Sequence, residues 1–175
     1  MRLVAVTTGA LLGAALCAAA GPAQAFERQW HVGAAAGVSN GTGLKMSPAL
    51  GLYAAYGLSD VFDARLEVTA RGYHLASEQN PNQLSAMLGL VYKLDVLRWV
   101  PWGGVYAGYQ GFDAVPRKDL VFARHDAALG LGLGLDYAFS RSFGAGVTLR
   151  FDDALTSDQA ATFDALLRAE YRWGW

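Results

Sequence analysis

Charged side chains at even spacing are the residues of this sequence that could form a buried ionic network. Since side chains alternate between the two faces of a β-strand, even spacing puts the charges of one segment on one face. The candidate network comprises Asp63, Arg65, Glu67, Arg71, Lys93, Asp136, Arg150, Arg168, Glu170 and Arg172. Both signs occur in similar numbers, and an uncompensated buried charge costs several kcal/mol, so enclosed charges must pair. We expect a salt-bridged plug, and the alternative is a gated pathway for small ions.

Histidines raise the question of acid–base catalysis. A serine hydrolase needs a nucleophilic serine within hydrogen-bond reach of a histidine that a third group orients. The candidates are His31, His74 and His125, with Ser77, Glu78, Ser85 and Asp126 as sequence neighbours of the last two. We predict no catalytic site and interpret His74 and His125 as polar residues near the rim of the protein, while a catalytic role for either histidine stays open.

Metal and cofactor chemistry has little support in the sequence. Asp152, Asp153 and Asp158 lie in a predicted loop and could bind calcium weakly through oxygen ligands, but a solvated acidic loop is the commoner explanation. The glycine-rich run 130–134 alternates like a strand and is followed by no helix that could bind a phosphate. We therefore expect no metal and no cofactor.

The elements that must position the charged residues are β-strands. Large apolar side chains alternate with small or charged ones in eight segments, and such alternation is typical of strands that separate an apolar from a polar medium. The segments lie near residues 30–38, 47–58, 61–74, 82–94, 99–110, 125–138, 142–152 and 162–175. Many of the 21 glycines fall on the charged face, where small residues would make room for larger ones across a narrow lumen.

The charged face must be the enclosed one if the apolar face meets lipid. A closed barrel satisfies every backbone group in lipid because each strand bonds to a neighbour and no edge is left. We predict an all-β fold, an eight-stranded antiparallel up-and-down transmembrane β-barrel. A soluble, lipocalin-like carrier is the competing interpretation, and the inward-facing charges argue against it.

The first 25 residues predict a secretory signal peptide. Arg2 supplies a positive start, Leu3 to Leu16 an apolar region, and Ala23-Gln24-Ala25 a cleavage site. The expected domains are thus the signal peptide, 1–25, and the barrel, 26–175. Cys17 leaves with the leader, so the mature chain has no cysteine for a disulfide. Removing Arg2 leaves 13 basic against 15 acidic residues, which offers no basic field for nucleic acid.

Connection lengths predict the orientation of the barrel. Short links near 58–60, 95–98 and 140–142 alternate with longer ones at 39–46, 75–81, 111–124 and 153–161. Short periplasmic turns and long outer loops are typical of outer-membrane barrels, so both termini are expected to be periplasmic. Aromatic residues gather toward both ends of the strands, as in interfacial girdles; those at the long-loop end are Tyr109, Phe112, Phe122, Phe151 and Phe163.

The longest loop is the candidate for contact with outside molecules. It combines two phenylalanines with the basic residues Arg117, Lys118 and Arg124. Because cations bind phosphate groups, we expect these three residues to contact lipopolysaccharide phosphates or an external partner.

The mature chain resembles the small eight-stranded outer-membrane barrels of the OmpA transmembrane domain and OmpX type. The most specific element is the last strand, which is similar to the aromatic-ended signal that the barrel-assembly machinery recognises: Leu167, Ala169, Tyr171, Trp173 and Trp175. The resemblance implies a Gram-negative outer membrane, with outer-membrane lipid, lipopolysaccharide, the assembly machinery and periplasmic chaperones as partners. We also expect a monomer, and the charge balance predicts no nucleic-acid partner.

The function that this resemblance implies is a structural or surface-interaction role. A small ion channel or porin is one alternative, and a lipid A-modifying enzyme is another, because some barrels of this class are lipid A deacylases or acyltransferases. Those enzymes use a histidine with a serine and an acidic residue. His125 is followed by Asp126 and Ala127, without the serine two positions on that the deacylase pattern has.

Overall fold

The computed structural model describes residues 28–41, 45–72, 82–94, 98–112, 125–156 and 161–174, and these form eight β-strands. The strands are β1 (Trp30–Gly41), β2 (Ser47–Gly57), β3 (Phe62–Gly72), β4 (Asn82–Lys93), β5 (Trp99–Phe112), β6 (His125–Ala138), β7 (Phe143–Ala154) and β8 (Thr162–Trp173). Every predicted strand is present. The largest differences at resolved boundaries are that β1, β5 and β7 continue further toward the long-loop end than the alternation indicated.

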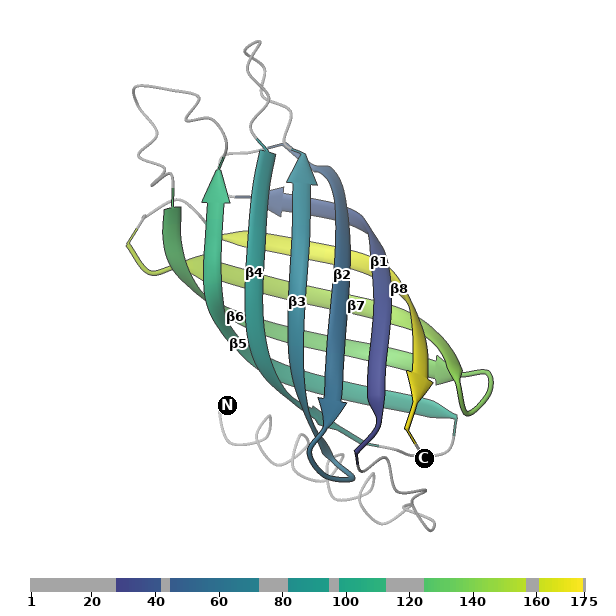
Figure 1. Cartoon of the computed structure of the whole chain (residues 1–175). Coiled ribbons are helices and arrows are strands. Elements are labelled where there is room, and N and C mark those ends of the chain that lie inside the picture. Colours follow the sequence, from purple (N-terminus) through teal and green to yellow (C-terminus); the bar gives the residue numbers. More distant parts are fainter. Residues whose placement is uncertain are drawn as a thin grey trace, which may run out of the picture.

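The strands form a closed barrel in sequence order (Figure 1). Each strand pairs antiparallel with its sequence neighbour, and β1 closes the barrel on β8 from Trp30 opposite Trp173 to Gly41 opposite Thr162. The predicted up-and-down topology is confirmed. Within the described ranges, no helix is long and apolar enough to cross a membrane.

Side chains alternate between a lipid-type outer surface and a polar interior. In β4, Leu84, Leu88 and Leu90 are exposed, whereas Gln83 and Lys93 are buried. The two largest fully buried side chains are both arginines, while leucines of the outer face reach an exposed fraction of 69%. This arrangement is the inverse of a soluble barrel, so the interpretation as a soluble carrier is wrong.

Two of the short turns use the same local chemistry. The Ser59 hydroxyl accepts a hydrogen bond from the Phe62 amide at 3.1 Å, and Ser140 does the same for Phe143 at 3.1 Å. Serine favours turns because its side chain can replace a backbone acceptor locally. These turns keep consecutive strands adjacent and so fix the register that places charges inside.

Aromatic rings form a belt at the short-turn end of the barrel. Cross-strand pairs have ring centroids 4.9 to 5.3 Å apart: Trp30–Tyr56, Phe62–Tyr92, Trp99–Tyr137 and Phe143–Tyr171. At the other end Tyr109, Phe151 and Phe163 face outward as expected. The prediction for Phe112 is wrong, because β5 continues to this residue and its side chain is buried on the inner face. Phe122 lies outside the described residues.

We expect the outer face of β6 to tolerate a charge only near its ends. Leu133 lies near the middle of the strand and is 64% exposed, so Leu133→Arg should lower the free energy of unfolding in lipid by about 2–4 kcal/mol. The matched control is Leu155→Arg, since Leu155 is similarly exposed but follows the end of β7, where the cost should be about 0–1 kcal/mol. Equilibrium urea titration in lipid vesicles measures both. Equal losses in the two variants would contradict a lipid-facing β6.

Candidate functional site

The candidate site is the barrel interior, into which all ten residues of the predicted ionic network project. Nine of them are buried, and the Glu67 side chain is 12% exposed. They fall into two groups along the barrel. We call Glu67, Arg71, Arg150, Asp152 and Asp164 the loop-end cluster, and Asp63, Arg65, Lys93, Asp136, Arg168, Glu170 and Arg172 the short-turn-end cluster.

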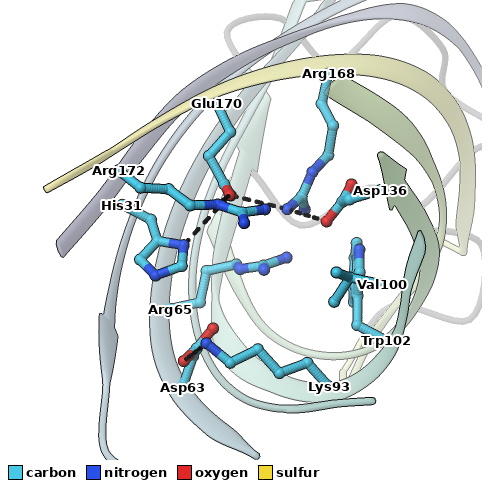
Figure 2. A pocket seen from close by; sticks show the side chains of 10 residues that line it. All are labelled: His31, Asp63, Arg65, Lys93, Val100, Trp102, Asp136, Arg168, Glu170 and Arg172. Atoms are coloured by element: carbon cyan, nitrogen blue, oxygen red, sulfur yellow. Dashed lines mark hydrogen bonds and ion pairs between the residues drawn. The ribbon is translucent and has the colours of Figure 1, made fainter. Parts of the chain in front are cut away.

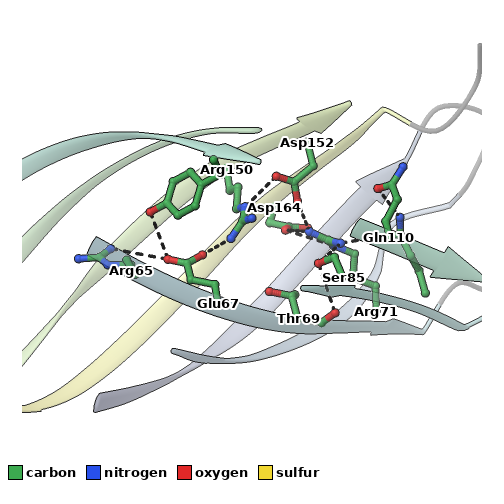
Figure 3. Close-up of polar contacts among 11 residues, drawn as sticks. Arg65, Glu67, Thr69, Arg71, Ser85, Gln110, Arg150, Asp152 and Asp164 are labelled. Carbon is green, nitrogen blue, oxygen red and sulfur yellow. Dashed lines mark hydrogen bonds and ion pairs between the residues drawn. The ribbon is translucent and has the colours of Figure 1, made fainter. Parts of the chain in front are cut away.

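Arg71 is the centre of the loop-end cluster (Figure 3). Its Nε donates to Asp164 Oδ1 at 2.9 Å, and its Nη2 donates to Asp152 Oδ2 at 2.7 Å. Its Nη1 donates to the Ser85 hydroxyl at 3.0 Å. The guanidinium, which presents five donors in a fixed plane, thereby ties β3 to β4, β7 and β8 across the lumen.

Arg150 forms the second node of this cluster (Figure 3). Its Nε donates to Asp152 Oδ1 at 2.8 Å, and its Nη1 is paired with the Glu67 carboxylate. The guanidinium lies 4.5 Å from the ring of Tyr106, whose hydroxyl donates to Glu67 Oε1 at 3.2 Å. Each acid at this node is therefore held by more than one donor.

Glu170 organises the short-turn-end cluster (Figure 2). The Tyr53 hydroxyl and Arg168 Nη2 donate to its Oε2 at 2.8 and 3.0 Å, while Arg172 and His31 contact its Oε1. Arg168 Nη2 also reaches Asp136 Oδ2 at 2.7 Å.

A separate pair closes the opposite wall of this cluster. Lys93 Nζ lies 2.7 Å from Asp63 Oδ1, which links β4 to β3. Arg65 stands between the two walls with its guanidinium 4.4 Å from the ring of Trp102. This is a cation–π contact, and Arg65 Nη1 also lies 3.7 Å from Glu67 Oε1 in the loop-end cluster.

Three aromatic side chains fill the space between the two clusters, and a glycine on the adjacent strand makes room for each. Tyr53 pairs with Gly33, Trp102 with Gly134, and Tyr106 with Gly89. A Cβ on any of these glycines would approach a ring atom to 2.3 Å, a distance that no packed side chain tolerates. The expectation that glycines make room for larger side chains is therefore met at these positions.

Sequence reasoning missed part of the loop-end cluster. Asp152 was expected in a solvated acidic loop, but β7 continues to Ala154, and Asp152 is an inward-facing, buried partner of two arginines. Asp153 points to the other face, so the expected carboxylate group does not form between these two residues. Asp158 lies outside the described residues. Among the residues that the structure does describe, no group of three metal-binding side chains is found.

The candidate catalytic residues that the structure describes do not lie close together. His125 is exposed on the outer face of β6 and stacks on Tyr109, with ring centroids 5.6 Å apart. Ser85 lies inside the lumen and serves Arg71. His74, Ser77 and Glu78 lie outside the described residues, so they stay predictions.

Two other sets of predicted residues are the assembly signal of the last strand and the basic residues of the longest loop. Leu167, Ala169, Tyr171 and Trp173 share the outward face of β8, whereas Trp175 lies outside the described residues. The basic loop residues Arg117, Lys118 and Arg124 also lie outside them.

The fold agrees with the comparisons with known proteins. The chain matches the model of the outer membrane protein beta-barrel domain family over residues 8–167 and belongs to that family, which lives in the bacterial outer membrane. No curated protein sequence matches the chain.

Solved structures of small outer-membrane barrels share the fold. Neisserial surface protein A has a TM-score of 0.64 and 15% identity, covering 86% of this chain and 99% of its own. The N-terminal β-barrel domain of Pseudomonas aeruginosa OprF has a TM-score of 0.60 and 16% identity, and the match covers 84% of this chain and 98% of that domain. Ail of Yersinia pestis has a TM-score of 0.54 and 16% identity, and the match covers 84% of this chain and 99% of Ail. At these identities the likeness concerns the fold alone.

We expect Arg71 to be the most costly single loss in the loop-end cluster. Arg71→Met leaves Asp152 and Asp164 with less compensation in a buried site, so the free energy of unfolding should fall by about 3–5 kcal/mol. Adding Asp164→Asn to this variant should recover part of the loss, because one of the two buried acids that lost their cation is then neutral. Urea titration of the single and double variants measures the coupling. Strictly additive losses would show that Arg71 and Asp164 do not interact.

Proposed function

We propose that this protein is a structural or surface-interaction protein of the outer membrane whose lumen is closed and whose contacts are made by its outer loops. The proposal includes the orientation: short turns and both termini on the periplasmic side, long loops outside. The observation that carries it is the filled interior, which leaves the loops and the outer rim as the parts free to bind other molecules.

The interior has little room for ion flow. A cavity of about 10 Å³ lies in the short-turn-end cluster, and another of about 20 Å³ lies beside Tyr53 and Glu67. A cavity of this size holds about one water molecule, whereas a hydrated ion carries several. Opening a path would require Arg71, Arg150 and Arg168 to leave carboxylates that they contact from other strands. The closed state is therefore the one that these pairs stabilise.

The rim at the loop end suits a surface role. His125 and Tyr109 stack where β5 and β6 enter the longest loop, and both side chains face outward. Amphipathic rings of this kind favour the headgroup level of a membrane. Basic residues of the loop that starts there would then lie close to the phosphates of lipopolysaccharide.

The closed lumen is tested by conductance. We expect the purified protein in planar bilayers to give no discrete current steps at 100 mV (roughly the scale of a membrane potential), because ion pairs and aromatic rings block the interior. A general porin from the same membrane, inserted under the same conditions, controls for bilayer quality. Reproducible single-channel steps from this protein would contradict the closed lumen and favour the small-channel alternative.

The surface role is tested by lipopolysaccharide binding. Replacing Arg117, Lys118 and Arg124 by glutamine should weaken binding on the order of 100-fold at low salt, since each cation near an anionic lipid surface contributes about 1 kcal/mol. Binding of labelled lipopolysaccharide to protein in detergent measures the change.

The matched control removes three exposed cations from the short-turn end: Arg28, Arg98 and Arg141, each replaced by glutamine. The net charge changes equally, but binding should stay within about twofold of the unmodified protein, a difference of less than about 0.5 kcal/mol. Equal losses in the two triple variants would indicate unspecific attraction, and no loss in the loop variant would rule out this loop as the contact.

A further inference from the structure

The outer wall of the barrel has an apolar hollow where β8, β1, β2 and β3 lie side by side (Figure 1). Its volume is about 700 Å³, within the range of pockets that bind small molecules, about 300–1,000 Å³. We call it the wall trough. Its low positions are alanines and its sides are leucines: Ala34, Ala36 and Ala169, and Leu50, Leu52 and Leu167.

The pairing register explains the trough. Ala36 of β1 lies between Leu167 of β8 and Leu50 of β2, so a single methyl group separates two much larger side chains. The preceding outward position of β1, Ala34, lies beside Ala169. Because side chains on one face of a sheet stand next to their cross-strand partners, short residues between long ones leave a channel along β1. All these residues lie near the middle of their strands, at the depth of the hydrocarbon core.

The two ends of the wall trough differ in the size of their side chains. Toward the short turns, Val32 lies beside Tyr171, which carries a large ring. Toward the long loops, Val38 lies beside Ala165, which carries a methyl group. The trough is therefore more open toward the loop end of the barrel.

An apolar path leads from the trough to an exposed cation at the loop end. Leu50, Pro48 and Met46 follow one another toward that end and are all exposed, and Lys45 comes next and is exposed as well. Lys45 is five residues from Leu50, which is at most about 17 Å along an extended chain. Half of a hydrocarbon core of about 30 Å is about 15 Å. The cation is therefore placed at the headgroup level above the trough.

An acyl chain with an anionic headgroup fits this combination. An apolar hollow in lipid holds no water, and an empty one would forfeit the dispersion contacts of its lining. A chain in the trough restores those contacts, while a phosphate of the same lipid meets Lys45. A second copy of the protein fits less well, because a symmetric contact joins the same patch of both copies, so that hollow would face hollow.

We propose that the wall trough binds one acyl chain of lipid A, the membrane anchor of lipopolysaccharide, with a phosphate of the same molecule at Lys45. This inference rests on the orientation in the proposed function, because the loop end must lie in the leaflet that holds lipopolysaccharide. The site is separate from the basic loop proposed above. That loop joins β5 and β6, which lie across the closed barrel from β1 and β2.

The first test maps lipid contacts on the unmodified protein in vesicles. Lipid A that carries a photoreactive group in one acyl chain is irradiated, and the labelled positions are identified by mass spectrometry. We expect label on β1, β2 and β8 in several-fold excess over the wall formed by β4, β5 and β6. A zwitterionic phospholipid with the same photoreactive chain is the control, and it should label the two walls evenly.

A pair of variants tests the shape of the trough. Ala36→Leu fills it and should weaken lipid A binding on the order of tenfold, since the chain loses contacts equivalent to roughly two methylene groups. Ala107→Leu is the matched control. Ala107 is also exposed and lies between two leucines, Leu88 and Leu129, but it is outside the trough and has large residues on either side of it along β5. Binding to this control should stay within about twofold of the unmodified protein.

A third variant tests the headgroup contact. Lys45→Gln should weaken binding of lipid A about fivefold, the effect of removing one cation near an anionic lipid surface. Labelling by the zwitterionic phospholipid should not change in this variant.

Lipopolysaccharide stripped of its acyl chains separates this inference from the proposed function. It keeps its phosphates, so the triple loop variant should lose binding of this probe, whereas Ala36→Leu should bind it as the unmodified protein does. If the loop variant loses binding and Ala36→Leu keeps full binding of lipid A, the loop contact stands and the trough is overturned. If Ala36→Leu alone loses lipid A, the trough stands without the loop.

Three further results would overturn the proposal. Lipid A could label the barrel evenly, or Ala36→Leu and Ala107→Leu could lose binding equally. A cross-linked dimer that Ala36→Leu abolishes would show that a second copy covers the trough instead. If Ala36→Leu does not fold, as judged by mobility on unboiled gels, the labelling pattern of the unmodified protein decides.

Discussion

The constraint on which the rest of this structure depends is that backbone polar groups in lipid must bond within the protein. Closure of β1 on β8 meets that constraint, because it removes the two edges that an open sheet would leave in hydrocarbon. Eight strands close into a barrel too narrow for an aqueous channel, so every inward side chain meets others from across the lumen. Closure of the barrel therefore requires the inward side chains of all eight strands to pack against one another.

Charge in this interior solves a second problem that the same chain faces. If the inner face were as apolar as the outer one, strands of 11 to 14 residues would become continuous apolar runs approaching the length of a membrane helix. Charged residues at alternate positions interrupt those runs. They also pair in the closed barrel, so that Arg71 and Asp164, which lie on different strands, compensate each other only after closure. The ionic network is therefore a product of the fold as well as a source of its stability.

The facing of the charged residues could be predicted from the sequence, whereas their partners could not. Period-two alternation places Arg71 and Arg150 inside whatever their neighbours are. Which acid each one meets depends on strand tilt and stagger, and Arg71 reaches Asp152 and Asp164, 81 and 93 positions away. The predictions for Asp152 and Phe112 were wrong for a related reason. Both residues lie at strand ends that continue past the clear apolar alternation, where a polar sequence resembles a loop.

The two clusters also differ in charge, and this difference bears on how the lumen stays closed. At the loop end Arg71 and Arg150 meet Glu67, Asp152 and Asp164, whereas cations outnumber acids at the short-turn end. Tyr53, Trp102 and Tyr106 lie between them. Arg65 and Arg168 lie over these rings, and Arg65 Nη1 also reaches to 3.7 Å from Glu67 Oε1. Loss of pairs at one end therefore leaves the ring layer and the other cluster in place. Three layers of side chains therefore fill the lumen in series, namely the two ionic clusters and the aromatic rings between them.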